Sequence, residues 1–343
     1  MSSTILVTGA AGFIGMHASR LLLREGHRVV GVDNLNDYYD PALKRARLAQ
    51  LDAEPGFAFE LADIAESDRI AAIFERHRPQ YVVHLAAQAG VRYAIDHPLA
   101  YVSSNLQGST VILEACRHHR IRHLAFASSS SVYGGNRSVP FRETDPVDHP
   151  VSFYAATKRA NELMAHSYAH LFGLPVTMLR YFTVYGPWGR PDMAMWKFTK
   201  GLLAGTPIDV YAGGELSRDF TYVGDAAQAT VRLLFLPPER TGEGPGSVAD
   251  VGADRSWAPF RIYNVGRSDP VTVNHLLALL ERETGRRAIR QELPMQPGDV
   301  ERTFADPSRL RAATGFEPKV GLEDGLREFV DWFRGWSARA AGG

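Results

Sequence analysis

Two side chains that could move a proton lie one helical turn apart near the middle of the chain. Tyr154 and Lys158 fall in SFYAATKRANELMAHSYAHLFG (152–173), a pattern that predicts a helix with both side chains on one face. A free phenol, with a pKa of about 10, is a poor base at neutral pH, whereas a neighbouring ammonium favours the phenolate. Tyr154 is therefore a candidate general base, although such a pair taken alone is more often an ordinary surface pair.

A run of serines precedes this helix. Ser129 ends the apolar run HLAFASS (123–129), which predicts a strand, and Ser130 and Ser131 follow it. Their hydroxyls could share a hydrogen bond to the oxygen that Tyr154 deprotonates. The alternative is that these serines only satisfy backbone groups where a strand meets a loop.

A third group of residues predicts a phosphate site near the start of the chain. Gly9, Gly12 and Gly15 follow the apolar run TILVT (4–8) and open a helical pattern, so backbone N–H groups and the helix N-terminus can approach a pyrophosphate. Asp33 ends the next apolar run, where a carboxylate would accept both hydroxyls of an adenosine ribose. The pattern favours a dinucleotide, and NAD rather than NADP. A tight turn and an exposed acid in an unrelated doubly wound protein would look similar.

The elements that must position these groups alternate along the first half of the chain. Apolar runs at 4–8, 28–33, 57–61, 81–86, 123–129 and 176–182 are separated by helical stretches, which predicts a parallel sheet covered on both faces. Beyond it, helical segments near 192–204, 223–236, 272–284 and 322–336 are joined by Gly/Pro-rich pieces, of which 237–260 is the least regular.

We therefore expect an α/β protein with a Rossmann-like, doubly wound parallel sheet and a smaller C-terminal α/β substrate lobe. The NAD-binding domain is expected over 1–182 and the substrate lobe over 183–343, with some chain returning to the first domain.

Composition narrows the possible partners. The 343 residues contain 38 basic and 38 acidic side chains, so no long-range field recruits nucleic acid or an anionic membrane surface. Cys116 is the single cysteine, which excludes an internal disulfide, and the nearby histidines lack a metal-ligand spacing. No apolar run approaches the roughly 20 residues of a membrane span. We expect a cytoplasmic protein without a metal, with a small molecule as its partner.

The chain resembles the extended short-chain dehydrogenase/reductase family over nearly its whole length. The family's motifs occur in order as TGAAGFIG (8–15), HLAAQ (84–88), SSSSVYG (128–134), YAATK (154–158) and RDFTYVGD (218–225). Within the family, DNLNDYYD (33–40), AGVRY (89–93), YGPWGRPDMA (185–194) and MQPGDV (295–300) resemble the UDP-glucuronate 4-epimerase branch.

The resemblance implies roles for further residues. On the cofactor side, these are Phe13, Ile14, Asn34, Asp63, Ile64, Leu85, Ala86, Ala87, Asn105, Tyr181 and Val184, with Lys158 on the nicotinamide ribose. On the UDP-sugar side, they are Thr183 at the hexose, Arg218 at the diphosphate, Tyr211 against uracil, and Arg92, Gln296 and Asp299. Gln296 stands where galactose epimerases carry a second arginine. The alternatives are that Arg92 is an ordinary surface arginine and that Tyr211 is an aromatic residue of the core.

The branch assignment depends on the serine run. Similar dehydratases carry an Asp-Glu pair at the positions of Ser130 and Ser131, and UDP-glucuronate decarboxylases carry a Glu at the second. Serine supplies neither the acid nor the base for elimination, so a 4-keto sugar formed at Tyr154 can only be reduced again. Arg190, in the loop after 176–182, is our candidate cation for a sugar carboxylate. An exposed loop arginine is the alternative.

The favoured function is thus a UDP-glucuronate 4-epimerase with tightly bound NAD, serving polysaccharide biosynthesis. The alternatives are a UDP-hexose or UDP-N-acetylhexosamine 4-epimerase, a UDP-glucuronate decarboxylase, and an NAD-sensing protein of the same fold. The family further implies a homodimer that pairs helices near 98–118 and 152–172, although an internal core would produce the same apolar stripes.

Overall fold

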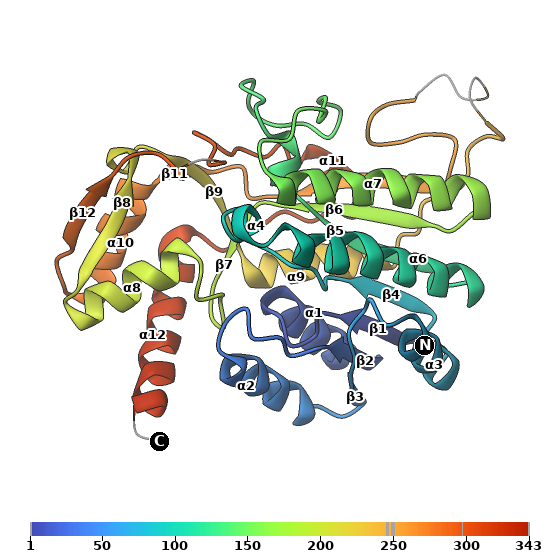
Figure 1. Cartoon of the computed structure of the whole chain (residues 1–343), viewed down its shortest axis with the longest axis horizontal. Coiled ribbons are helices and arrows are strands. Elements are labelled where there is room, and N and C mark those ends of the chain that lie inside the picture. The colour runs from blue at the N-terminus through green and yellow to red at the C-terminus, as the bar shows by residue number, and fades with distance from the viewer. Residues whose placement is uncertain (1, 245–246, 248–250, 297, 342–343) are drawn as a thin grey trace.

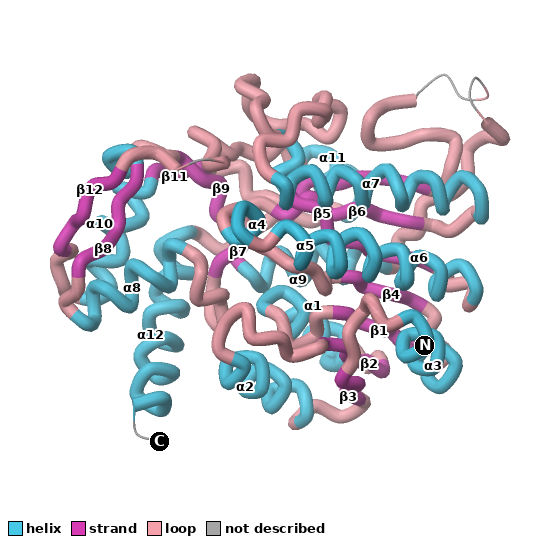
Figure 2. Tube along the Cα trace, viewed as in Figure 1, coloured by secondary structure: helices cyan, strands magenta, loops and turns pink. Residues whose placement is uncertain are grey.

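A parallel sheet of seven strands forms the centre of the molecule (Figures 1 and 2). The computed structural model describes residues 2–244, 247, 251–296 and 298–341. The strand order is β10-β6-β5-β4-β1-β2-β3, and every neighbouring pair is parallel. The strands are β1 (Thr4–Thr8), β2 (Arg28–Asp33), β3 (Phe57–Leu61), β4 (Tyr81–His84), β5 (His123–Ser129), β6 (Val176–Tyr181) and β10 (Phe260–Val265). The predicted α/β, Rossmann-like fold is confirmed.

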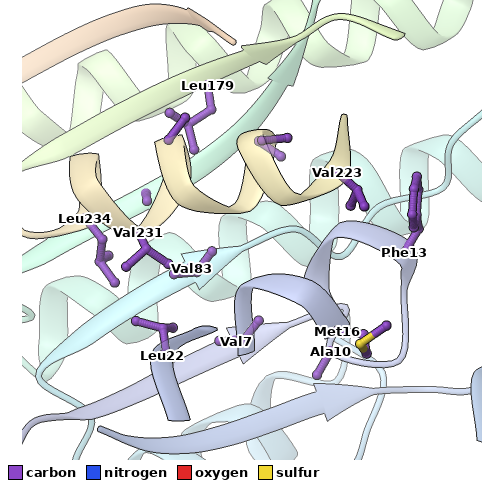
Figure 3. Packing of buried hydrophobic residues seen from close by; sticks show 14 of the residues in the cluster. Val7, Ala10, Phe13, Met16, Leu22, Val83, Leu179, Val223, Val231 and Leu234 are labelled. Atoms are coloured by element: carbon purple, nitrogen blue, oxygen red, sulfur yellow. The ribbon is translucent and has the colours of Figure 1, made fainter. Parts of the chain in front are cut away.

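Helices cover both faces of this sheet because its strands are apolar on both sides. Successive residues of β1 alternate: Ile5 and Val7 belong to one buried cluster, and Leu6 belongs to the other. The first cluster includes side chains of α1 (Phe13–Arg24), α2 (Pro41–Asp52), α9 (Val223–Leu234) and α11 (Ser308–Thr314). Figure 3 shows α1 and α9 packed side by side, with Met16, Leu22 and Val231 pointing between them and the sheet.

The opposite face is covered by α3 (Ser67–His77), α6 (Ser109–His118) and α7 (Phe153–Phe172). Short helices α4 (Tyr93–Asp96) and α5 (Pro98–Tyr101) and a π-helical segment, η1 (Val102–Gly108), lead into α6. Their packing places Tyr154 and Lys158, near the start of α7, close to the carboxyl end of β5.

The strand order fixes where a ligand can bind. The chain winds from β1 through β2 to β3, and then returns to place β4 on the other side of β1. The loops after β1 and β4 therefore diverge and open a crevice at the carboxyl edge of the sheet. The glycine turn follows β1, and residues 85–92 follow β4, so both lie at this crevice.

A smaller group of elements stands beyond that edge (Figure 1, left). It contains a sheet of β7 (Thr183–Tyr185), β9 (Ser217–Tyr222) and β11 (Pro270–Thr272), and a second sheet of β8 (Pro207–Tyr211) and β12 (Ile289–Leu293). Helices α8 (Ala194–Ala204), α10 (Val273–Thr284) and α12 (Leu322–Ala341) pack around a cluster that includes Phe198, Leu280 and Phe329.

Elements from the second half of the chain, namely α9, α11 and β10, return to the central sheet. Helix α9 packs on α1, β5 and β6, and β10 adds a seventh strand beside β6. The sequence analysis did not identify β10, because FRIYNV (260–265) follows a long Gly/Pro-rich stretch. Within 237–259 the described residues form loops and bridges, and residues 245–246 and 248–250 lie outside the described residues. The predicted domain boundary near residue 182 stays a prediction.

A buried arginine ties the glycine turn to a loop of the second half. Arg47, on α2, is fully buried, and its Nη1 donates to the carbonyl oxygen of Ala11 at 3.1 Å. The same guanidinium donates to the carbonyl oxygens of Trp188 at 2.7 Å and Gly189 at 3.0 Å. The phenol of Tyr39 lies 2.6 Å from Nη1. Arg47 therefore braces the loop that carries Arg190 against the start of α1.

We predict that Arg47→Leu strongly destabilises the protein. The substitution leaves the carbonyls of Ala11, Trp188 and Gly189 without their donor, and an unpaired buried polar group costs about 1–3 kcal/mol. We expect the free energy of unfolding, measured by urea denaturation, to fall by about 3 kcal/mol or more. Arg45→Leu changes an exposed arginine of the same helix and serves as the matched control. Equal stability of the two variants would contradict the brace.

Candidate active site

A large cavity of about 810 Å³ lies between the carboxyl edge of the central sheet and the smaller group of elements. Its lining runs from the glycine turn, past the serine run and Tyr154, to Tyr211 and Arg218 on β8 and β9. Most of the residues predicted from the sequence line this one cavity; Asp63, Asn105 and Gln296 are not among its lining residues within the described chain.

The glycine turn is shaped for close approach of a phosphate. Gly9 has a φ of +70°, and a side chain there would meet the backbone nitrogen of Ala86 at 2.8 Å. Helix α1 begins at Phe13, and its N-cap residue Gly12 has no capping side chain. The first N–H groups of the helix are thus left for a ligand, and Gly9, Gly12, Phe13, Ile14 and Gly15 all line the cavity.

Asp33 stands at the end of β2, beside this turn. Its carboxylate accepts the N–H of Ala11 at 3.2 Å and the N–H of Leu35 at 2.9 Å, and it also lines the cavity. Burial raises the pKa of Asp33, while the ammonium of Lys44 and the two N–H groups act in the opposite direction. A carboxylate held in this way retains lone pairs for the two hydroxyls of a ribose. These residues fit the adenosine half of NAD.

Around the adenine position, Asn34 and Ile64 line the cavity, whereas Asp63 acts behind them. Asp63 accepts a hydrogen bond from the Asn34 amide at 2.8 Å and another from the N–H of Ala65 at 2.9 Å. The resemblance placed Asp63 and Ile64 together beside the adenine. In the structure, Ile64 presents its apolar side chain and Asp63 fixes the loop.

Asn105 also supports the cofactor side from behind. It is fully buried in η1, where its amide donates to the carbonyl of Gln88 at 3.0 Å and its oxygen accepts the N–H of Gln88 at 2.8 Å. These bonds hold the strand end that carries Leu85, Ala86 and Ala87, all of which line the cavity. The predicted supporting role of Asn105 agrees with this position.

The candidate catalytic groups converge near the middle of the cavity. Tyr154 and Ser129 both line the cavity, and Ser129 acts to lower the pKa of the Tyr154 phenol. Lys158 is buried, and its ammonium donates to the carbonyl oxygen of Ala127 at 3.0 Å. Burial lowers the pKa of Lys158 to about 8, so the amine is still mostly protonated at neutral pH. All three side chains line the same cavity, and their catalytic roles stay a prediction.

Protein groups alone do not make Tyr154 a strong base. Burial raises the pKa of Tyr154, while the Ser129 hydroxyl and the cation of Arg190 act to lower it. A further positive charge is needed to favour the phenolate at neutral pH, and the nicotinamide ring of NAD would carry that charge. The chemistry of this donor set therefore fits NAD.

A buried ion pair behind these groups was not found from the sequence. Glu162 lies one helical turn beyond Lys158, and its carboxylate accepts both Nε and Nη2 of Arg180, at 2.8 and 2.9 Å. The Ser128 hydroxyl donates to the same carboxylate at 2.6 Å. Burial opposes ionisation of Glu162, but Arg180 outweighs it and holds the pKa of Glu162 below its usual value. The pair fixes α7, β5 and β6 relative to one another.

Other predicted residues line the sugar part of the cavity. Ser130 and Ser131 form a short turn directly after Ser129, and the N–H of Ser131 donates to the Ser129 hydroxyl at 3.1 Å. Thr183, Tyr181 and Val184 line the wall formed after β6, and the Tyr181 hydroxyl is bonded to Thr230 at 2.6 Å. Arg190 also lines the cavity and is ion-paired with Asp192.

The far end of the cavity holds a second group of charges. Arg92 pairs with Asp299 at 3.0 Å, and its guanidinium lies over the ring of Tyr211, 4.6 Å from the centroid. Arg218 donates to the carbonyl of Ser217 at 2.9 Å. Burial and the cation of Arg92 lower the pKa of Arg218, and the carboxylate of Asp299 acts against them. Gln296 accepts the N–H of Asp299 through its carbonyl, at 3.2 Å.

Sequence reasoning missed Tyr38, Lys44 and Asp192, which also line the cavity. Tyr38 lies within DNLNDYYD (33–40), and Asp192 lies two residues after Arg190 in YGPWGRPDMA (185–194). The Arg-x-Asp spacing in that loop was a usable signal, because side chains two apart in a turn can pair. The long-range contact to Tyr38 left no such signal.

Residues 5–243 match the model of the NAD dependent epimerase/dehydratase family. The chain belongs to this family. The predicted family is confirmed, and with it NAD as the cofactor of an epimerase-type enzyme.

Relatives within this family resemble the chain over most of its length. It is 48% identical over 332 residues to a protein of Rhizobium meliloti (strain 1021) named a probable UDP-glucuronate 4-epimerase, and the match covers 96% of each chain. It is 45% identical over 335 residues to UDP-glucuronate 4-epimerase 1 of Arabidopsis thaliana, covering 96% of this chain and 76% of the plant protein.

Solved structures agree with these relatives. The crystal structure of UDP-glucuronic acid 4-epimerase from Bacillus cereus, in complex with UDP-glucuronic acid and NAD, aligns with a TM-score of 0.86 at 32% identity. That alignment covers 97% of this chain and 99% of the Bacillus chain.

The described residues contain no group of three or more His, Cys, Asp or Glu side chains arranged to hold a metal ion. Among the described helices, none is both long and apolar enough to cross a membrane.

We predict that Asp33→Asn weakens NAD retention without unfolding the protein. The carboxylate is expected to bind both ribose hydroxyls, and a hydrogen bond to a charged group is worth about 1.5–3 kcal/mol, or roughly a ten- to hundredfold change in the dissociation constant. The measurement is the NAD released by denaturing the purified protein, followed by titration of the stripped protein. Asp37→Asn, at an exposed position four residues later, is the control. Equal NAD content in both variants would exclude this role for Asp33.

Proposed function

We propose that the protein is a UDP-glucuronate 4-epimerase that interconverts UDP-glucuronate and UDP-galacturonate through a 4-keto sugar. The observation that carries this proposal is the meeting, in one cavity, of Tyr154 with Arg190 and with a serine run that contains no carboxylate. The names of the Rhizobium and Arabidopsis relatives and the Bacillus structure support it.

Tyr154 acts as the base for the hydroxyl on carbon 4. Its phenolate takes the hydroxyl proton in the first half of the reaction and returns it in the second. Ser129, which lines the same cavity, shares with that phenol the hydrogen bond to the substrate oxygen. Bound NAD supplies a reversible hydride acceptor at carbon 4. The reaction consumes no reductant, so the cofactor stays with the enzyme.

Lys158 contributes from one turn further along α7. Its ammonium uses one proton on the carbonyl of Ala127, which leaves two N–H donors for the nicotinamide ribose. The buried Glu162 near it raises the pKa of Lys158 against the effect of burial, which keeps the amine charged. A charged Lys158 then favours the phenolate form of Tyr154.

The sugar carboxylate is assigned to Arg190, with Ser130 and Ser131 as neutral donors beside it. Arg190 is close enough to Tyr154 for their charges to interact. A sugar with carbon 4 at the phenol would therefore bring its carbon 6 carboxylate toward this guanidinium. Serines at 130 and 131 provide no acid or base for loss of a hydroxyl. The 4-keto sugar therefore returns to an alcohol, and a turned ring gives the carbon 4 epimer.

The nucleotide is assigned to the far end of the cavity. Arg218 is suited to the diphosphate because it carries a fixed charge and lies on β9 facing the cavity. Tyr211 offers a ring for uracil, and Arg92, Asp299 and Gln296 complete the ribose and phosphate contacts. Thr183 faces the hexose. Anchoring at this end leaves the sugar free to turn.

The first experiment is incubation of purified protein with UDP-glucuronate, without added cofactor, followed by proton NMR of the sugar. We expect UDP-galacturonate signals to grow, and Tyr154→Phe to slow them by at least about a hundredfold while leaving NAD bound. UDP-xylose or a 4-keto pentose would indicate a decarboxylase instead. Turnover of only UDP-galactose or its N-acetyl analogue would indicate a hexose epimerase. Bound NAD with no turnover of any UDP-sugar would favour a sensing protein.

We also propose a homodimer formed through α5, η1 and α7. Leu99 is 78% exposed and Leu163 is 56% exposed on these elements, and Val102 is also exposed, so an apolar strip faces outward. Such a strip fits a second copy of the same helices. We further propose a cytoplasmic location and a role in polysaccharide biosynthesis, since a nucleotide-activated uronic acid is a glycosyl donor; cell fractionation tests the location.

The dimer is tested by sedimentation velocity of the purified protein. We expect the wild type to sediment as a dimer and Leu99→Asp, which places a charge in the strip, to sediment as a monomer. Ile289→Asp, at an exposed apolar position on β12, is the control and should remain dimeric. A monomeric wild type would refute the proposed interface.

A further inference from the structure

The guanidinium of Arg190 is held by a carboxylate inside the cavity. Its Nε donates to Oδ1 of Asp192 at 3.0 Å, and its Nη2 donates to Oδ2 at 2.6 Å. The Tyr38 hydroxyl donates to the same Oδ2 at 3.2 Å. All three side chains line the cavity together with Tyr154. We call Arg190, Asp192 and Tyr38 the guanidinium clamp.

The backbone under the clamp is fixed from the other half of the chain. Arg47 bonds the carbonyls of Trp188 and Gly189, and a ring nitrogen of His17 lies 3.0 Å from the carbonyl oxygen of Pro187. Three consecutive carbonyls before Arg190 are thus held by buried or half-buried side chains. The clamp stands on a rigid support rather than on a free loop.

Room for Tyr38 is also built into the fold. Gly90 has a φ of +98°, and a side chain at that position would meet the Tyr38 hydroxyl at 2.6 Å. The Tyr38 ring packs against Tyr93, with centroids 4.9 Å apart. The hydroxyl is therefore directed at Asp192 by packing on one side and by a glycine on the other.

The clamp uses one edge of the guanidinium and leaves the other. Asp192 takes the Nε and Nη2 positions in the two-point geometry that carboxylates prefer, whereas the described residues offer Nη1 no hydrogen-bond acceptor. Burial opposes ionisation of Asp192, but the guanidinium outweighs it and holds the pKa of Asp192 below its usual value. Both groups are therefore ionised, and their opposite charges cancel before a sugar carboxylate binds.

An arginine whose charge is already balanced suits a substrate whose sugar ring must rotate within the site during the reaction. To receive hydride on its other face, the 4-keto ring turns, and carbon 6 with its carboxylate moves relative to a fixed guanidinium. An unpaired cation in a partly buried site would attract a carboxylate with its full charge and would release it slowly. A cation already paired with Asp192 attracts the carboxylate less strongly.

We propose that Asp192, held by Tyr38, is a positioning residue that presents the Nη1–Nη2 edge of Arg190 to the sugar carboxylate and, by balancing its charge, weakens its grip, so that the 4-keto ring can turn. The inference rests on the proposed function, because it requires a uronate substrate. Asp192 then governs how the sugar carboxylate is released, whereas Arg190 binds it.

The clamp also acts on Tyr154, which gives a second readout. The cation of Arg190 lowers the pKa of Tyr154, and the carboxylate of Asp192 raises it. The other groups that act on this phenol are Ser129 on β5 and Tyr101 on α5, and Lys158 lies one turn further along its own helix. Removing the charge of Asp192 leaves Arg190 uncompensated and favours the phenolate. Since the phenolate is the active base, the acidic limb of kcat/KM then moves to lower pH.

The test measures epimerisation of UDP-glucuronate by wild type, Asp192→Asn and Tyr38→Phe across pH. For Asp192→Asn we expect KM and kcat to fall together, each by about five- to tenfold, with the acidic limb at lower pH. Tyr38→Phe should change both constants in the same direction by less. Asp192→Glu restores the charge and should return the acidic limb to the wild-type position. Arg190→Ala should instead raise KM.

The outcomes separate this inference from the proposed function. If the wild type does not convert UDP-glucuronate, the proposed function is wrong, whatever the variants do. If the wild type is active but Asp192→Asn raises KM, or leaves KM, kcat and the acidic limb unchanged, the clamp does not govern release. Should Asp192→Asn fail to fold by thermal denaturation, Tyr38→Phe decides, and an unchanged KM and kcat in that variant would overturn the inference.

Discussion

The catalytic groups stand where they do because of the buried ion pair between Arg180 and Glu162. Arg180 belongs to β6 and Glu162 to α7, and their two-point bond at 2.8 and 2.9 Å joins the sheet to the helix that carries Tyr154 and Lys158. Ser128 bonds to the same carboxylate, so the end of β5, and Ser129 with it, is held in the same network. Buried ion pairs add little net stability when compared with apolar packing, but they tolerate few arrangements. In this protein, that restriction fixes the position of Tyr154 and Lys158 relative to Ser129.

The cavity is lined by charges that are largely balanced in place. Arg92 is paired with Asp299, Arg190 with Asp192, and Lys158 lies near Glu162. A ligand with a diphosphate and a carboxylate therefore meets cations that are already oriented by protein carboxylates. Orientation before binding lowers the cost of ordering long side chains around the ligand. It also limits the strength of each single contact, which suits a substrate that must shift within the site during each turnover.

Residue separation decides how much of this could be predicted from the sequence. Tyr154 and Lys158 lie four apart, and Gly9, Gly12 and Gly15 lie in one turn, so local geometry alone places them and the prediction of their grouping needed no fold. Arg47 meets Trp188 across 141 positions and Tyr38 meets Asp192 across 154, and no local pattern marks either contact. The same holds for β10, whose pairing with β6 depends on a return of the chain to the sheet. The contacts that could not be predicted are those that join the first and second halves of the chain.

The two ends of the cavity face opposite demands. At the nucleotide end, Tyr211 and Arg218 lie on β8 and β9, regular strands of the smaller group of elements, and can hold uracil and diphosphate throughout the cycle. At the sugar end, the ring must contact Tyr154 in two orientations, so contacts that favour only one orientation would slow the other half-reaction. In the proposed function, neutral serine hydroxyls, which can rotate, and an arginine already paired with Asp192 would serve both orientations of the ring. The absence of a carboxylate at positions 130 and 131 then has two effects, because it removes the chemistry of elimination and it leaves small, adaptable donors where the ring turns.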